Sequence, residues 1–269
     1  RGMHRYIISN SDEVKDVMNV YVMMKLCGYA PENLNIDIVP LFETMEGLDR
    51  SLEVMQTLYH HTVYQKHLAK RNNKQVIMLG FSDGTKDGGY LKANWQIYTA
   101  KEKLTKLSEE NGIKVVFFDG RGGPPARGGG KTHDFYASQG NTIANNQIEL
   151  TIQGQTITSV FGNKDQAKFN FEQLLTAGVE NDVFKSIKKD LNEKERSLIS
   201  ELADISYKKY SDLKAHPMFV PYLQEMSTLE YYGRTNIGSR PSKRGAGSEL
   251  KFEDLRAIPF VGSWSQLKQ

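Results

Sequence analysis

The amino-acid sequence predicts an α/β protein whose strands run parallel, in a sheet or a barrel. Short β-type runs recur along the first 150 residues at a spacing of about 31 to 40 residues. Helix-type segments separate the early runs, and a glycine closes two of these segments. Alternation of strand and helix is typical of parallel architectures, because a helix carries the chain back to the end of the sheet where the next strand starts.

The elements follow one another in a regular order. The β-type runs are RYIIS near Arg5, NIDIVPLF near Ile36, QVIMLGF near Val76, KVVFF near Val115 and IELTI near Ile148. The helices expected between them cover residues 11–26, closed by Gly28, 48–59, and 89–111, closed by Gly112.

The pattern changes after Lys164. A mostly helical stretch is expected over residues 164–230, and we interpret its charged run as a solvated face. A basic loop rich in Gly, Ser and Pro follows from residue 236 and leads into a sixth apolar strand near residues 255–264.

Composition limits the classes of function. The formal charge of +3 is too small and diffuse to argue for nucleic acid. Cys27 is the only cysteine, which rules out an intramolecular disulfide and a four-cysteine zinc site. A single cysteine fits a reducing, cytoplasmic setting. No apolar run is long enough for a membrane span, so we expect a soluble protein without membrane or nucleic-acid partners. The chain starts at Arg1 and ends at WSQLKQ, and we expect further sequence on both sides.

Polar side chains follow several of the predicted strands directly. Glu43 follows DIVPLF, Asp83 and Lys86 follow VIMLGF, and Arg121 and Arg127 follow KVVFFDG. The carboxyl ends of parallel strands are where ligands bind, because the loops that follow them converge on one face. We therefore expect these five side chains to line one ligand-binding site, the mouth of the sheet or barrel.

Glu43 and Asp83 form a pair of carboxylates on adjacent strand ends, with no His or Cys beside them. Such a pair suits a hard divalent ion that keeps several waters, which favours Mg²⁺ or Mn²⁺. The alternative is that each carboxylate caps the next helix or pairs with a neighbouring arginine.

The segment GRGGPPARGGGKTH, residues 120–133, is expected to bind an oxyanion or phosphate. Its glycines let backbone N–H groups approach an anion, and its two arginines supply forked donors. Two alternatives compete with this interpretation. A Walker A loop needs a glycine where Pro125 stands, and RGG-type RNA contacts occur in segments of low apolar content, whereas this segment follows a buried strand.

The remaining charged candidates have ordinary alternatives. Lys86 lies three residues after Asp83 and can reach the same loop face, although a solvent-exposed turn lysine is the commoner case. A second basic group near the C-terminus is either a solvated loop or, for the residues that flank apolar sequence, part of the mouth; it contains Arg240, Lys243, Arg244 and Arg256. His133 and His216 are expected at the surface or at helix starts.

Five motifs together resemble phosphoenolpyruvate carboxylase. They occur in that family's order and span nearly the whole chain: PLFET at 40–44, GFSDGTKDGG at 80–89, FFDGRGGPPARGGG at 117–130, NIGSRPSKR at 236–244 and LRAIPF at 255–260. The resemblance implies a TIM-type (β/α) barrel, incomplete in this chain and carrying additional helices. Residues 1–269 would form a single fragment of the catalytic barrel, with residues 164–230 as a helical excursion. The six expected strands are fewer than the eight of a closed barrel.

The resemblance also implies a carboxy-lyase that fixes carbon dioxide and replenishes the tricarboxylic acid cycle. Phosphoenolpyruvate and bicarbonate give oxaloacetate and phosphate with Mg²⁺ or Mn²⁺, through carboxyphosphate and the enolate of pyruvate. By motif, the metal ligands are Glu43 and Asp83, the phosphate-binding residues Arg121 and Arg256, and the catalytic residues Arg127, Arg240 and Lys86.

Some features of the family are absent or changed. The family's catalytic histidine lies upstream of this chain, and neither His4 nor His133 can be assumed to replace it. TIQGQ stands at 151–155 where TEQGE is expected, Phe260 stands where Trp is common, and Pro124 and Pro125 stiffen the glycine segment.

Two hypotheses follow. The first is the catalytic part of a carboxylase that is a homo-tetramer at full length, inactive as a fragment. The second is a non-catalytic anion-binding or assembly domain on the same scaffold.

Overall fold

Five parallel strands form the sheet of the computed structural model, which describes residues 3–30, 33–120, 131–152, 155–184, 190–234 and 250–267. The strands are β1 (Arg5–Ile8), β2 (Asp37–Phe42), β3 (Lys74–Leu79), β4 (Lys114–Asp119) and β5 (Ile148–Leu150). They lie side by side in chain order, and every neighbouring pair is parallel. The predicted α/β class and its five early strands are confirmed.

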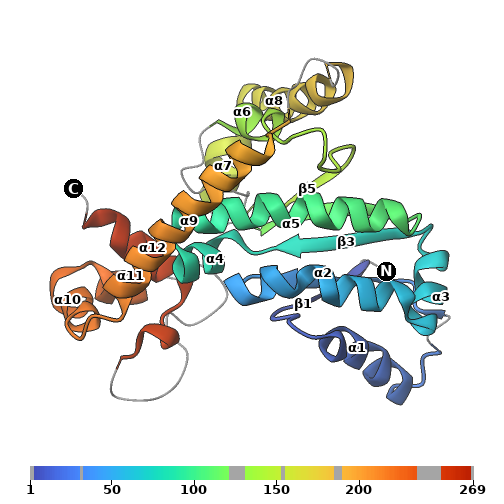
Figure 1. Cartoon of the computed structure of the whole chain (residues 1–269), viewed down its shortest axis with the longest axis horizontal. Helices are drawn as coiled ribbons and strands as arrows, with labels where there is room; N and C mark the ends of the chain where they lie inside the picture. The colour runs from blue at the N-terminus through green and yellow to red at the C-terminus, as the bar shows by residue number, and fades with distance from the viewer. Residues whose placement is uncertain are drawn as a thin grey trace.

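Helices pack on one face of this sheet, and others lie beyond its carboxyl end (Figure 1). Those of the first half are α1 (Val14–Leu26), α2 (Met45–His60), α3 (Thr62–Lys70), α4 (Phe81–Gly88), α5 (Tyr90–Glu110) and α6 (Thr132–Ala137). Those of the second half are α7 (Gln155–Phe161), α8 (Lys164–Val183), α9 (Glu193–Lys214), α10 (Phe219–Met226), α11 (Leu229–Arg234) and α12 (Ala257–Gln266). Among the described helices, none is both long and apolar enough to cross a membrane.

The predicted closing glycines end their helices as expected. Gly28 follows α1 with a φ of 85°, and Gly112 follows α5 with a φ of 66°. Both values lie in the left-handed region, which glycine enters without the steric cost of a Cβ. A Cβ at either position would meet nothing within 4 Å, so the backbone angle alone calls for glycine.

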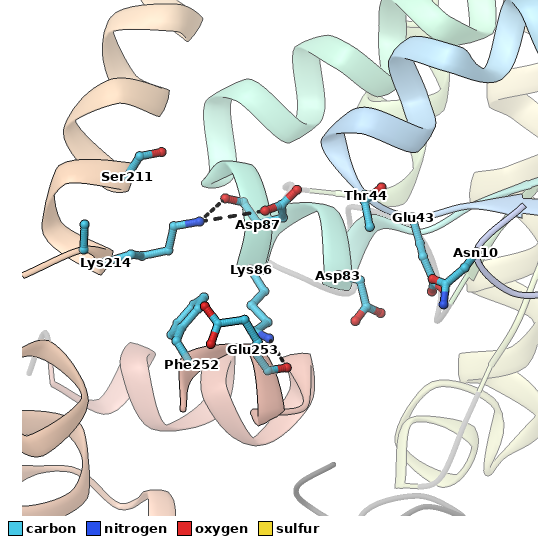
Figure 2. Close-up of a pocket in the computed structure, with 11 residues that line it drawn as sticks. Asn10, Glu43, Thr44, Asp83, Lys86, Asp87, Ser211, Lys214, Phe252 and Glu253 are labelled. Carbon is cyan, nitrogen blue, oxygen red and sulfur yellow. Dashed lines mark hydrogen bonds and ion pairs between the residues drawn. The ribbon is translucent and has the colours of Figure 1, made fainter. Parts of the chain in front are cut away.

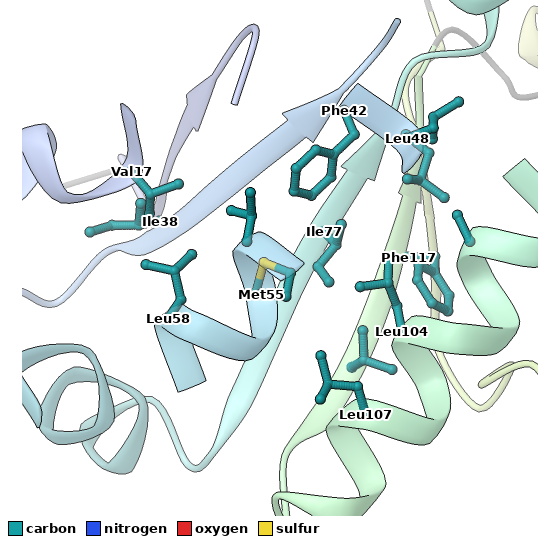
Figure 3. Close-up of a cluster of buried hydrophobic side chains, with 14 of the residues drawn as sticks. Val17, Ile38, Phe42, Leu48, Met55, Leu58, Ile77, Leu104, Leu107 and Phe117 are labelled. Carbon is teal, nitrogen blue, oxygen red and sulfur yellow. The ribbon is translucent and has the colours of Figure 1, made fainter. Parts of the chain in front are cut away.

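The main core lies between one face of the sheet and helices α1, α2 and α5 (Figure 3). Alternate strand residues face it, because successive side chains of a strand point to opposite faces. Burying each large apolar side chain stabilises the fold by roughly 1.5–3 kcal/mol. The fully buried strand and helix residues of this core include Phe42, Ile77, Phe117, Met55, Leu58 and Leu104.

The opposite face of the sheet is concave. Val39, Val76 and Val116 form a small buried cluster on it. Arg5 of β1 and Glu149 of β5 are joined there by an ion pair of 2.6 Å, although they belong to the two edge strands. A flat sheet would hold edge strands about 19 Å apart, a separation that the two side chains do not span, so the sheet is strongly curved.

The sixth expected strand was wrong, because the apolar stretch near 255–264 contains helix α12. Pro259 lies in the first turn of this helix, where its missing N–H costs no intrahelical bond. Phe260 and Trp264, one turn apart, stack at 6.3 Å and pack with Phe219 of α10. A short apolar run has no period that separates strand from helix, and packing against these aromatic rings decides the outcome.

FSDGTKDGG, which we expected to be a loop, is also helical over α4. Its glycines lower intrinsic helix propensity, which is why the segment resembles a turn in sequence. Contacts with Met45 of α2 favour the helix: a Cβ on Gly84 would lie 3.3 Å from the Met45 methyl group, and one on Gly88 would collide with the Met45 sulfur. The two glycines therefore lower the helix propensity of α4 but also allow its close packing against Met45.

Candidate functional site: a charged cleft at the carboxyl ends of the strands

A cleft of about 430 Å³ lies where β2 and β3 end (Figure 2). Five segments of the chain meet there: the ends of β1 and β2, helix α4, the last turn of α9, and the short helix η4 (Phe252–Asp254). The described lining residues are Asn10, Glu43, Thr44, Asp83, Lys86, Asp87, Ser211, Lys214, Ala215, Phe252 and Glu253. Three of the residues predicted from strand ends, Glu43, Asp83 and Lys86, thus share one cleft.

Glu43 follows β2 directly, and close packing fixes its backbone. A Cβ built on Gly80, at the end of β3, would lie 2.4 Å from the Cβ of Glu43 and 2.9 Å from its Cα. The Gly80 N–H donates to the carbonyl of Phe42 at 2.8 Å. Only a glycine lets the two strand ends approach this closely.

The alternative role of Glu43 as a helix cap is not what the structure shows. Thr44 is the N-cap of α2, and its hydroxyl accepts a hydrogen bond from the Gly47 N–H at 2.9 Å. The carboxylate of Glu43 lines the cleft beside Asn10, and that of Asp83 lies on the same side (Figure 2). Both predicted carboxylates therefore border the same space.

Lys86 reaches across the cleft. Its ammonium donates to the backbone carbonyl of Glu253 at 3.4 Å and lies 4.8 Å from the centre of the Phe252 ring. These contacts join α4 to η4, 167 residues further along the chain. A solvent-exposed turn lysine, the commoner alternative, does not describe this geometry.

Three residues of the cleft region had no signal in the sequence: Asp87, Tyr210 and Lys214. The Tyr210 hydroxyl donates to the Lys86 carbonyl at 2.8 Å, and the Lys214 ammonium donates to the Asp87 carbonyl at 2.5 Å. Lys214 also lies 3.9 Å from the Asp87 carboxylate and 4.7 Å from the centre of the Tyr210 ring. Burial lowers the pKa of Lys214, against the opposing effect of the Asp87 and Glu253 charges.

The described lining carries four carboxylates and two lysines, so its balance is negative. No group of three or more His, Cys, Asp or Glu side chains among the described residues has an arrangement that could hold a metal ion. Two carboxylates without His or Cys still fit a hard ion such as Mg²⁺, which binds through one or two carboxylates and keeps waters for its other positions. Glu43 and Asp83 meet that requirement.

Of the predicted arginines, Arg256 is among the described residues. Arg256 is half-buried at the start of α12, a helix that packs on α4, and it is not among the described residues that line the cleft. Arg121, Arg127 and Arg240 lie outside the described residues, as do Lys243 and Arg244.

The two histidines have structural partners. His133 in α6 lies 3.2 Å from the Glu180 carboxylate of α8. His216 accepts the Met218 N–H at 3.1 Å just before α10, in agreement with the expected position near a helix start. Phe260 is buried in the C-terminal aromatic cluster.

The chain is an α/β protein with a charged cleft at the carboxyl ends of its parallel strands, which is the position where such proteins bind ligands. The family model of phosphoenolpyruvate carboxylase matches residues 1–269, and the chain belongs to that family. It is 36% identical over 266 residues to the phosphoenolpyruvate carboxylase of Corynebacterium efficiens and 37% identical over 266 residues to that of Corynebacterium glutamicum. Both matches cover 97% of this chain but 29% of the relative, so the chain spans under a third of the length of these relatives.

Proposed function

We propose that this chain supplies the metal-binding and phosphate-binding part of a phosphoenolpyruvate carboxylase, which forms oxaloacetate and phosphate from phosphoenolpyruvate and bicarbonate. The observation that carries the proposal is the meeting of Glu43, Asp83 and Lys86 in one cleft, in a chain of this family. The names of both relatives favour this hypothesis over a non-catalytic assembly domain.

In this proposal Glu43 and Asp83 hold Mg²⁺ or Mn²⁺. The bound ion would supply Lewis-acid stabilisation of negative charge on the enolate oxygen. Lys86 adds a positive charge on the opposite side of the cleft, where an anionic substrate needs it. Arg121 and Arg256 bind the phosphate, Arg127 binds carboxyphosphate, and Arg240 is a further catalytic residue; these four roles rest on the motifs alone.

We also propose that the protein is a TIM-type barrel and that the five described strands form an arc of it. An ion pair joins Arg5 and Glu149 on the two edge strands. This contact supports the barrel, because it requires a curved sheet and a barrel is a sheet curved until it closes. Residues 1–269 then form one barrel fragment, and the helices between residues 164 and 230 are an excursion from it. A cytoplasmic location, a homo-tetramer at full length and inactivity of the fragment alone stay predictions.

Titration with Mn²⁺ tests the metal site, with calorimetry and the spectrum of the bound ion as readouts. Wild type should bind Mn²⁺ saturably, and Glu43→Ala and Asp83→Ala should each weaken binding at least about tenfold, since each removes a direct ligand. Glu46→Ala is the matched control, because this exposed carboxylate in the first turn of α2 lies outside the cleft lining.

Phosphoenolpyruvate is then added with and without Mn²⁺. Metal-dependent binding of phosphoenolpyruvate supports the proposed substrate. Folded wild type that binds no Mn²⁺, or variants that bind it like wild type, would refute the assignment of Glu43 and Asp83.

A further inference from the structure

We propose that Lys214 and Tyr210, at the end of α9, are positioning residues that hold α4, and thereby the two proposed metal ligands Glu43 and Asp83, in the geometry for a divalent ion. The inference rests on the proposed metal site and adds to it a support that neither the motifs nor the relatives assign. The structural basis is a series of hydrogen bonds that runs from α9 through α4 to Met45, two residues after Glu43.

The first link is between α9 and the carboxyl end of α4. A helix ends with carbonyl groups that have no partner within the helix. In α4 two of them accept from α9: the Lys86 carbonyl from the Tyr210 hydroxyl at 2.8 Å, and the Asp87 carbonyl from the Lys214 ammonium at 2.5 Å. The Lys214 cation also interacts favourably with the partial negative charge at the carboxyl end of the helix dipole.

Backbone geometry at the next residue strengthens the link. Gly89 follows α4 with a φ of 77°, and a Cβ built there would lie 3.3 Å from a ring carbon of Tyr210. The Tyr210 ring therefore packs directly on the turn that ends α4. Helix α4 has only eight residues, two of them glycines, so it depends on such external contacts.

The second link runs from α4 to the segment that carries Glu43. The Asp87 carboxylate accepts the Met45 N–H at 3.0 Å, and Met45 is the first residue of α2. That N–H is one of the orphan donors of a helix start, where a carboxylate is favourable. Because Glu43 precedes Met45 by two residues and Asp83 lies one helical turn before Asp87, this bond fixes the two proposed ligands relative to each other.

Charge explains why a lysine stands at position 214. The ammonium lies 3.9 Å from one oxygen of the Asp87 carboxylate (Figure 2). The other oxygen accepts the Met45 N–H. Both carboxylate oxygens of Asp87 therefore have partners within the protein. Asp87 thus has a structural role and is not proposed as a third metal ligand beside Glu43 and Asp83. The side chain of Lys214 is 15% exposed, so its contacts are little screened by water.

Mn²⁺ affinity tests the proposal in Lys214→Met, Lys214→Arg and Tyr210→Phe, with Lys92→Met as the matched control. Lys92 of α5 also reaches α9, at 2.7 Å from the Asp204 carboxylate, but lies outside the cleft lining. We expect about tenfold weaker Mn²⁺ binding in Lys214→Met, the effect of losing an outer-shell partner, and substantial recovery in Lys214→Arg. Lys92→Met should bind Mn²⁺ like wild type.

Hydrogen exchange of the α4 amides, measured without metal, is the second readout. Lys214→Met should exchange faster over residues 81–88 while helix α2 and the sheet stay protected, and Lys92→Met should not. Unchanged Mn²⁺ affinity and unchanged α4 exchange in Lys214→Met would overturn the inference even if Glu43→Ala and Asp83→Ala abolish binding. If wild type binds no Mn²⁺, the proposed metal site fails, and the exchange data alone decide whether α9 holds α4.

Discussion

Arg5 and Glu149, on the two edge strands of the sheet, approach to 2.6 Å. Their side chains are 36% and 11% exposed, so the pair is neither buried nor freely solvated. Arg5 also lies 3.7 Å from Asp37, which is bound by Arg71 at 2.7 Å. Curvature of the sheet is thus accompanied by a charge network on its concave face.

A double-mutant cycle with Arg5→Met and Glu149→Gln should give a coupling energy of about 1 kcal/mol in the free energy of unfolding, the upper range for partly exposed pairs. Lys208 and Asp212, an exposed pair on α9 at 3.0 Å, supply the control cycle, which should give about 0.3–0.5 kcal/mol. Equal coupling in the two cycles would show that contact between the edge strands adds nothing to stability.

Asp119 and Lys101 form a buried ion pair at 2.9 Å, with side chains 4% and 3% exposed, and the Tyr136 hydroxyl donates to Asp119 at 2.9 Å. Asp119→Ala should lower the free energy of unfolding by about 3–5 kcal/mol, because it leaves a buried ammonium without its carboxylate. The double variant Lys101→Met, Asp119→Leu should recover most of that loss. Chemical denaturation measures both, and a double variant as unstable as the single one would contradict this account.

His67 is 2% exposed and packs against Tyr21 at 5.4 Å, and burial lowers its pKa to about 4. In the unfolded chain the group titrates near 6.5, so between these values the unfolded state binds the extra proton. Stability should therefore fall as the pH falls from about 6.5 to about 4, by up to about 3 kcal/mol. His67→Phe should flatten this part of the stability curve; an unchanged slope would show that other groups cause it.

Gly80→Ala should abolish Mn²⁺ binding or weaken it at least about tenfold, because the new Cβ would have to push the end of β3 away from Glu43. Gly178→Ala is the control: Gly178 lies in α8 with nothing within 4 Å of the added Cβ. That change should stabilise the chain by about 0.5–1 kcal/mol and leave Mn²⁺ binding unaltered. Wild-type affinity in Gly80→Ala would mean that the close approach of the strands is irrelevant to the site.

Local pattern was sufficient for the sheet and for part of the cleft. The five early strands combine apolar runs with regular spacing, and the carboxyl-end rule brought Glu43, Asp83 and Lys86 together. Pattern failed where tertiary contacts override propensity. Helix α4 forms around glycines that pack on Met45, and the apolar run of α12 has the same local signal as a buried strand.

Tyr210 and Lys214 could not be found from sequence for a different reason. Their partners on α4 lie 124 and 127 residues away, and α9 carries three other lysines and one other tyrosine. Helical periodicity gives the face of a residue but not the neighbour that this face meets. Arg121, Arg127 and Arg240 were proposed from motifs, lie outside the described residues and stay predictions.

The distance along the chain between α4 and its two supports also has a consequence for biosynthesis. Glu43 and Asp83 leave the ribosome more than 120 residues before Tyr210 and Lys214. At about 5–20 residues per second, that interval lasts roughly 6–25 s. During this time the nascent chain holds both carboxylates without the helix that fixes them, so a complete metal site should arise late in synthesis, after α9 has emerged.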